Sequence, residues 1–334
     1  MNPTNQKNFT TSRGFNYAYY RIPAGKNGLP TVFLAHGFPD TALLWQDLVE
    51  SHLMPAGYGV LAIDCLGYGG TSKPVDNEAY SWDLMAQDVA QLLTHEGINK
   101  VVSMGHDFGS AVAQRFYNFF PDRVNALVML NVAYNPPLGV PFDLDAVIKQ
   151  TEAALGYGCF HYWKVTASDE GPALHNSHID SFWDLAHGKP ETWRYKTFCQ
   201  PDGYKQFLLQ NQHQETEPYA TEEKKAAFIA RMKRDGFDAP LAYYRSMVRN
   251  VQSKADATVP VKNRIVEVPT LYVGAAKDYT CPPAAIKGFL SIDGGFLPHL
   301  TTVVLDGGHF ALLTNPEEFG RSVVDWLGGI FQDH

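Results

Sequence analysis

A glycine-flanked aspartate is the most distinctive chemical feature of the sequence. Residues 105–109 read Gly-His-Asp-Phe-Gly, after an apolar run and before a helix-like segment. Flanking glycines permit a tight turn from strand to helix, which holds the central side chain, here Asp107, at the edge of a sheet. A carboxylate is charged at neutral pH and needs no base to attack. Asp107 therefore suits displacement at a saturated carbon, which would leave an alkyl ester on the protein. The neighbouring His106 is expected to be a packed, hydrogen-bonded side chain rather than a second base.

An acid and a histidine follow this aspartate in the chain order that would complete a triad. Asp278 follows the apolar run 270–276, and His309 follows the run 300–306. Loops at the carboxyl ends of parallel strands meet at one edge of a sheet, so we expect both side chains to approach the nucleophile. Asp306 competes with Asp278 for the role of the acid, but its place three residues before the histidine favours a turn.

Short apolar runs that alternate with helical segments indicate how these residues are positioned. Helical periodicity covers residues 83–95 and 110–120, where Pro121 ends the second segment, and a last helix is expected over 316–331. Alternation of this kind predicts an α/β fold with a mostly parallel sheet and helices on both faces. The expected strands are 31–37, 58–64, 100–105, 125–131, 270–276 and 300–306.

The pattern changes near residue 135, where three prolines and a glycine follow in quick succession. From about 140 to 255 no strand is indicated, and the segment is helix-like and rich in aromatic residues. We therefore predict an inserted all-helical cap, or lid, over residues 138–255. Residues 1–137 and 256–334 would together form the core domain.

Composition excludes several classes of protein. The 334 residues include 27 Lys and Arg and 35 Asp and Glu, a net charge of −8, which argues against nucleic-acid binding. The four cysteines are far apart, so neither a disulfide framework nor a zinc site is expected. No apolar run approaches the ~20 residues that span a bilayer, and the first residues lack a secretory signal. We expect a cytoplasmic protein, monomeric or homodimeric, without metal or organic cofactor.

Two further motifs accompany the Gly-His-Asp-Phe-Gly turn. The segment 36–39 reads His-Gly-Phe-Pro after the first core strand, and 64–74 reads Asp-Cys-Leu-Gly-Tyr-Gly-Gly-Thr-Ser-Lys-Pro after the next. Together they resemble the α/β-hydrolase fold and, within it, the soluble epoxide hydrolase family, over residues 30 to 325. The family often has Trp where this chain has Phe108, and a basic residue where it has Leu66. The resemblance implies the addition of water to an epoxide, giving a vicinal diol.

The resemblance also implies roles for individual residues. Tyr244, within Ala-Pro-Leu-Ala-Tyr-Tyr-Arg at 239–245, and Tyr162, within Phe-His-Tyr-Trp at 160–163, match the cap tyrosines that protonate the epoxide oxygen. Tyr157 is an alternative to Tyr162. His309, oriented by Asp278, would activate the water that attacks the ester on Asp107. The backbone N–H groups of Phe38 and Phe108 would hold the oxyanion.

An apolar and aromatic pocket is expected around these groups, favouring apolar or aromatic epoxides and a role in detoxification. The candidate lining residues are Phe38, Phe108, Trp163, Trp183, Phe198, Met247 and Phe310.

Two rival functions remain open. A haloalkane or haloacid dehalogenase would use the same nucleophile, but it must stabilise a halide, and Phe38 and Phe108 supply no side-chain donor. A non-catalytic small-molecule receptor could share the scaffold, although a pure binder does not need all three triad groups. A serine esterase is disfavoured because Ser110 lies beyond the turn, inside the helix.

Overall fold

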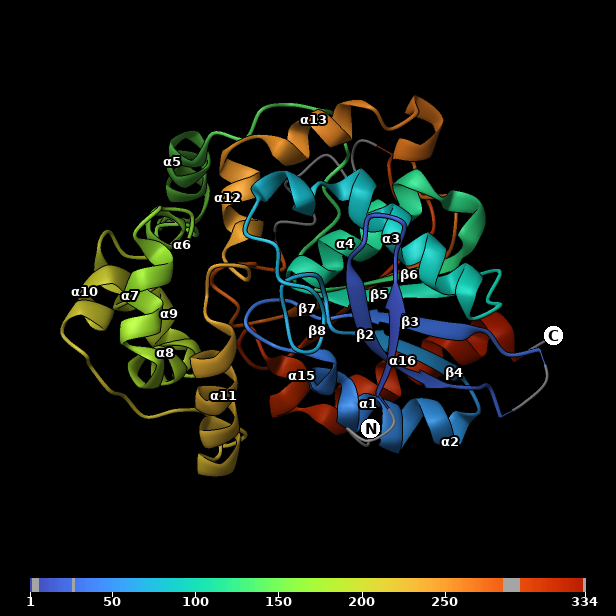
Figure 1. Cartoon of the computed structure of the whole chain (residues 1–334), viewed down its shortest axis with the longest axis horizontal. Helices are drawn as coiled ribbons and strands as arrows, with labels where there is room; N and C mark the ends of the chain where they lie inside the picture. The colour runs from blue at the N-terminus through green and yellow to red at the C-terminus, as the bar shows by residue number, and fades with distance from the viewer. Residues whose placement is uncertain (2–5, 26–27, 285–294, 333–334) are drawn as a thin grey trace.

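The computed structural model describes residues 1, 6–25, 28–284 and 295–332. Its centre is a sheet of eight strands in the order β1-β2-β4-β3-β5-β6-β7-β8 (Figure 1). From β4 to β8 neighbouring strands are parallel, whereas β1, β2 and β4 pair antiparallel. The strands are β1 (Gln6–Thr10), β2 (Asn16–Ile22), β3 (Thr31–Ala35), β4 (Gly59–Ile63), β5 (Val101–His106), β6 (Val124–Leu130), β7 (Thr270–Ala275) and β8 (Leu300–Leu305).

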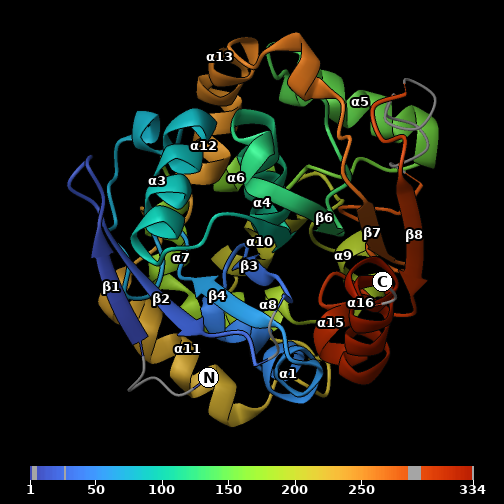
Figure 2. The ribbon, with the colours of Figure 1, turned by 90° about the vertical axis from the view of Figure 1, so that its right-hand side faces the viewer.

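All six strands expected from the sequence are present, and β1 and β2 are two further strands before them. Every residue of β3 and β4 is buried, because helices cover both faces of the sheet and leave no face for polar side chains. Figure 2 shows α3 (Trp82–His95) and α4 (Phe108–Phe119) on one face, with α1 (Gln46–Leu48) and α16 (Pro316–Phe331) on the other. The predicted α/β fold is confirmed.

A run of helices connects β6 to β7 and lies to one side of the sheet in Figure 1. Its residues form helices and one isolated bridge, between Gly188 and Thr216, which agrees with an all-helical cap. Its boundaries at 138–255 remain a prediction, since α13 continues to Ala257 and contacts α3 of the core. The helices are α5 (Leu144–Leu155), α6 (Trp163–Thr166), α7 (Gly171–Ser177), α8 (Ile179–Ala186), α9 (Pro190–Tyr195), α10 (Gly203–Leu209), α11 (Glu222–Asp235), α12 (Ala242–Val248) and α13 (Val251–Ala257).

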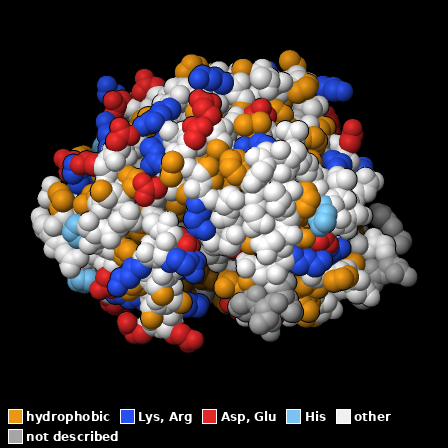
Figure 3. Space-filling model, in the orientation of Figure 1, with side chains coloured by type: hydrophobic (Ala, Val, Ile, Leu, Met, Phe, Trp, Pro, Cys, Tyr) orange, Lys and Arg blue, Asp and Glu red, His pale blue; other side chains and the backbone are white. Residues whose placement is uncertain are grey.

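Acidic and basic side chains are interspersed on the face of the molecule shown in Figure 3. Among the described residues, no helix is both long and apolar enough to cross a membrane. All four cysteines lie in the described part of the chain and are free thiols.

A buried ion pair ties the two ends of the helical segment to the core. Arg115 on α4 donates from Nε and Nη2 to the two carboxylate oxygens of Asp256 on α13, at 2.6 and 2.8 Å. Its Nη1 donates to the backbone oxygen of Asn135, where the segment begins, at 2.9 Å. Because α4 starts directly after Asp107, the helix that follows this residue also holds both connections to the cap.

Replacement of Asp256 by Asn should destabilise the protein strongly. The Arg115 guanidinium would stay buried without its counter-charge, and the loss of one partner of a buried pair costs about 3–5 kcal/mol. We expect urea titration to show a free energy of unfolding lowered by about 3 kcal/mol. Asp145→Asn is the matched control, because Asp145 pairs with Lys164 at the exposed surface, where an ion pair adds little. Equal effects of the two changes would contradict a stabilising role for the buried pair.

Candidate active site

Asp107 occupies a sharp turn between β5 and α4. Its φ of 54° and ψ of −128° lie outside the usual regions for a side chain other than glycine. The neighbouring glycines make the turn possible: a Cβ on Gly105 would lie 1.9 Å from the backbone oxygen of Gly109, and one on Gly109 would lie 2.0 Å from that of Ala35. The carboxylate is thereby held at the carboxyl edge of the sheet, as the sequence predicts.

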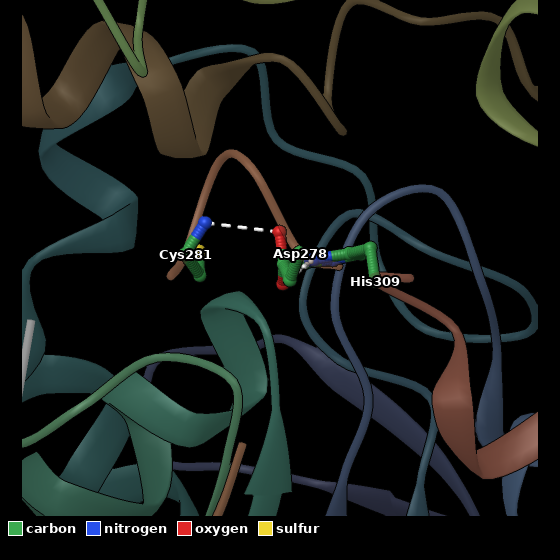
Figure 4. Close-up of side chains that lie close together, drawn as sticks. All are labelled: Asp278, Cys281 and His309. Atoms are coloured by element: carbon green, nitrogen blue, oxygen red, sulfur yellow. Dashed lines mark hydrogen bonds and ion pairs between the residues drawn. The ribbon is translucent and has the colours of Figure 1, made fainter. Parts of the chain in front are cut away.

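His309 and Asp278 reach this carboxylate from the loops after β8 and β7. The Nδ1 of His309 donates to Asp278 Oδ2 at 2.7 Å (Figure 4). The Nε2 of His309 lies 3.6 Å from Asp107 Oδ2. The other oxygen of Asp278 accepts from the backbone N–H groups of Thr280 and Cys281 at 3.0 and 2.9 Å. Asp306 instead pairs with Lys277 at the surface, 2.9 Å away. The structure thus brings together the three groups of the predicted triad.

The surrounding charges set the protonation of these groups. Burial alone would lower the pKa of His309, but the Asp278 and Asp107 carboxylates outweigh it and raise this pKa to about 9. Burial opposes ionisation of Asp278, yet His309 and the hydrogen bonds to the carboxylate hold its pKa well below the usual range. Burial raises the pKa of Asp107, an effect that His309 partly offsets. The two carboxylates thus favour the protonated form of His309.

Two backbone N–H groups point at the nucleophile. Phe38 N–H donates to Asp107 Oδ1 at 2.9 Å, and Phe108 N–H is a second hydrogen-bond donor to this carboxylate. Gly37 allows the approach, because a Cβ there would lie 2.4 Å from the Cβ of Asp107. The two N–H groups thus lie where the predicted oxyanion hole requires donors.

Tyr162 and Tyr244 belong to the cap segment and line the same cavity as Asp107 and His309. Their ring centroids are 5.9 Å apart, and both rings are buried. Burial raises the pKa of both hydroxyls well above the usual value, and neighbouring groups that include Asp107 add to this effect, so each keeps its proton. Tyr157 instead packs against Arg194 and is not among the described residues that line the cavity. The geometry favours Tyr162 over Tyr157.

The cavity lies between cap and core, and most of its wall is apolar. Of the expected lining residues, Phe38, Phe198 and Phe310 are in the wall. The full set is Phe38, Pro39, Asp107, Tyr162, Ala186, Trp193, Phe198, Tyr244, Thr280, His309 and Phe310.

Four expected lining residues lie outside this wall. The rings of Phe108 and Trp163 pack behind Tyr244, at centroid distances of 4.8 and 5.1 Å, so the tyrosine covers them. Trp183 packs against His187, with the ring centroids 3.9 Å apart and the rings tilted by 45°. Met247 is partly buried against the core on α12.

Trp193 is the main functional candidate that the sequence reasoning missed. It stacks on Phe198 at 3.9 Å and lies 5.4 Å from the His309 ring. It belongs to the aromatic cap segment, but nothing in that pattern distinguishes it from its neighbours. Pro39 also lines the cavity, and its place at the end of the His-Gly-Phe-Pro motif is a signal from which this could have been predicted.

Asp278, Cys281 and His309 also offer potential metal ligands within 4.8 Å of one another (Figure 4). Hydrogen bonds already occupy both oxygens of Asp278. The arrangement fits an acid–base pair better than a metal site.

Comparison with known proteins agrees with this geometry. The family model for the alpha/beta hydrolase fold matches residues 30–316. The bifunctional epoxide hydrolase 2 of Sus scrofa is 28% identical over 301 residues, which cover 89% of this chain and 51% of that protein. The chain thus spans about half the length of this relative. Epoxide hydrolase A of Mycobacterium tuberculosis is 27% identical, with 92% of this chain and 94% of that protein covered.

A solved structure resembles the whole chain. The crystal structure of epoxide hydrolase A from Mycobacterium thermoresistibile superposes with a TM-score of 0.77 at 27% identity, covering 97% of this chain and 98% of that one. With its fold, its nucleophile turn and the family match together, the chain belongs to the α/β-hydrolase fold family. Several of its relatives are named epoxide hydrolases.

The raised pKa of His309 predicts a pH-dependent contribution to stability. A pKa of about 9 in the folded state exceeds the reference value of 6.5, so this contribution is complete below pH 6.5 and is lost as the pH rises through 9. The stability difference between wild type and His309→Gln should therefore shrink over this range, by on the order of 3 kcal/mol. Urea titrations at intervals of pH would measure it.

His299→Gln is the control, because His299 is exposed. Its stability difference from wild type should not vary over the same pH range. A constant difference for His309→Gln as well would show that the imidazole is not paired with the carboxylates.

Proposed function

We propose that the protein is an epoxide hydrolase that converts an epoxide and water into a vicinal diol through an ester on Asp107. The observation that carries this proposal is the arrangement of the cavity. A carboxylate nucleophile faces two tyrosines that keep their protons, and the His309–Asp278 pair lies beside the nucleophile. The names of the relatives support the same reaction.

In the first half-reaction, Oδ2 of Asp107 attacks an epoxide carbon. Oδ1 is held by the N–H of Phe38 and becomes the carbonyl oxygen of the ester. The C–O bond of the epoxide breaks, and its oxygen takes a proton from Tyr162 or Tyr244. An unassisted alkoxide would be a poor leaving group in an apolar cavity, so hydrogen bonding by both phenols lowers the barrier.

In the second half-reaction, His309 removes a proton from water, and the resulting hydroxide attacks the ester carbonyl of Asp107. Formation of the ester removes one of the carboxylates that raise the pKa of His309, so the imidazolium then gives up its proton more easily. That proton returns to the phenolate left by ring opening, in the same cavity, and the neutral imidazole can act as base. The N–H groups of Phe38 and Phe108 hold the oxyanion. Collapse of this intermediate breaks the ester C–O bond, and the departing oxygen takes up the remaining proton of the attacking water. The diol is released, the Asp107 carboxylate is restored, and His309 keeps the proton that it removed from water.

The cavity wall indicates the class of substrate. Apart from Asp107 and His309, its side chains are apolar, aromatic or uncharged. Apolar or aromatic epoxides should therefore bind better than charged ones. Detoxification in the cytoplasm is the corresponding cellular role, by a monomer or a homodimer.

A haloalkane dehalogenase remains the second candidate because of Trp193. Its indole N–H is buried without a hydrogen-bond partner among the described residues, and its ring lines the cavity. Such a donor could stabilise a departing halide. The two tyrosines favour an oxygen leaving group instead.

Trapping of the ester in His309→Gln tests the reaction. Without its base, the enzyme should open the epoxide but fail to hydrolyse the ester. Intact-protein mass spectrometry after exposure to styrene oxide should show a gain of one whole epoxide, which Asp107→Ala abolishes. An adduct formed only from a haloalkane, lighter by the lost hydrogen halide, would identify a dehalogenase. No adduct from either compound, with an inactive wild type, would favour a binding protein.

Replacement of the cap tyrosines by phenylalanine tests the oxygen-protonating step. Tyr244→Phe and Tyr162→Phe should each slow formation of the ester by about 10²-fold or more in single-turnover measurements, as expected for loss of a general acid. Tyr157→Phe is the matched control and should keep the wild-type rate. An unchanged rate in both cap variants would show that neither hydroxyl assists ring opening.

A further inference from the structure

The backbone carbonyl of His309 accepts two side-chain hydrogen bonds from the ends of two central strands. The Nε2 of His106, at the end of β5, donates to this oxygen at 2.9 Å. The Nδ2 of Asn131, directly after β6, donates to it at 3.0 Å. The loop that carries His309 is thereby fixed to β5, which leads into Asp107, and to its neighbour β6.

Asn131 makes a second contact with the triad. The same Nδ2 donates to Oδ2 of Asp278 at 2.6 Å, so its two hydrogens contact both members of the acid–base pair. The residue is buried and has a left-handed backbone, with a φ of 62°. Its own position is secured by the hydroxyl of Tyr272, which donates to its backbone oxygen at 3.0 Å, and by its N–H, which donates to the oxygen of Val273 at 2.9 Å.

His106 is a neutral donor. Burial, and then the nearby His309, lowers its pKa to about 3. Since a carbonyl oxygen can only accept, the single ring proton of His106 must be on Nε2. Its Nδ1 is buried and has no hydrogen-bond partner among the described residues. A proton on Nδ1 would therefore add a charge to a buried site that already holds the His309 imidazolium.

We propose that Asn131 and His106 are positioning residues that fix the acid–base pair for hydrolysis of the ester, through the carbonyl of His309 and the carboxylate of Asp278. This inference rests on the proposed epoxide hydrolysis. Attack by Asp107 needs only the carboxylate and the tyrosines, whereas ester hydrolysis needs His309 aimed at a water molecule. Loss of either positioning residue should affect the second half-reaction selectively.

Asn131→Gly is the sharpest test, because glycine keeps the left-handed backbone and removes only the side chain. Single-turnover measurements with styrene oxide should show ester formation within about threefold of wild type and ester hydrolysis slowed about tenfold to a hundredfold, less than the loss of a general base costs. The ester should accumulate in mass spectra. Asn211→Gly is the matched control, since Asn211 also has a left-handed backbone, with a φ of 48°, and is exposed.

The pH profile of ester hydrolysis separates positioning from general damage to the fold. The hydrogen bond from Asn131 to Asp278 weakens the electrostatic stabilisation of the His309 imidazolium by this carboxylate. Removal of the Asn131 side chain should therefore raise the pKa of His309 and move the midpoint of the pH profile of ester hydrolysis to higher pH. A loosened fold would lower the rate without this upward shift. The titratable groups around the His309 ring are Asp278, Asp107, Asp40, His106, His187, the thiol of Cys281 and the phenols of Tyr162 and Tyr244.

Two substitutions of His106 test the second donor. His106→Gln retains an N–H that can reach the His309 carbonyl, whereas His106→Leu fills the space without a donor. We expect the leucine variant to slow ester hydrolysis about tenfold or more, and the glutamine variant to recover most of the rate.

The outcomes distinguish this inference from the proposed function. If wild type forms no ester and no diol, the proposed function fails. If wild type is active but Asn131→Gly and His106→Leu hydrolyse the ester at the wild-type rate, the positioning role is overturned. Equal slowing of both half-reactions in Asn131→Gly would likewise contradict it, because the defect would not be specific to the base.

Discussion

The burial of two carboxylates beside one imidazole is the constraint on which the rest of the structure depends. A buried charge is tolerated only when counter-charges and hydrogen bonds replace its water. Asp107 therefore has the N–H groups of Phe38 and Phe108, and Asp278 has those of its own loop. Close approach of this backbone to Asp107 in turn requires Gly37, Gly105 and Gly109. The motifs recognised in the sequence thus supply the backbone donors and the glycines that stabilise these buried charges.

Much of the fold and of the candidate triad could be predicted because their signals are local. Buried parallel strands are continuous apolar runs, and the turn around Asp107 needs glycine at fixed positions. The cavity wall is different. Trp193 faces the cavity while Trp163 packs behind Tyr244, although both are tryptophans on short cap helices. Helices of four to six residues have too little periodicity to show which face is buried, so tertiary packing decides it.

The α4 helix connects the candidate active site to the cap. It begins after Asp107, supplies the Phe108 N–H, and carries Arg115, which holds Asn135 and Asp256 at the two ends of the helical segment. The cap in turn supplies Tyr162 and Tyr244 to the cavity. One helix thus contacts both the turn at Asp107 and the two ends of the segment that carries the cap tyrosines.

The double attachment at Arg115 has a consequence for the exchange of caps between relatives. A chimaera that joins a foreign helical segment to this core must supply an acceptor at the point of entry and a carboxylate near the point of exit. If the exchanged segment includes residues 135 and 256, the native acceptors are removed together with the cap. The Arg115 guanidinium then stays buried in the core without a partner. Compatibility of cap and core in recombined enzymes would thus depend on two contacts remote from the substrate.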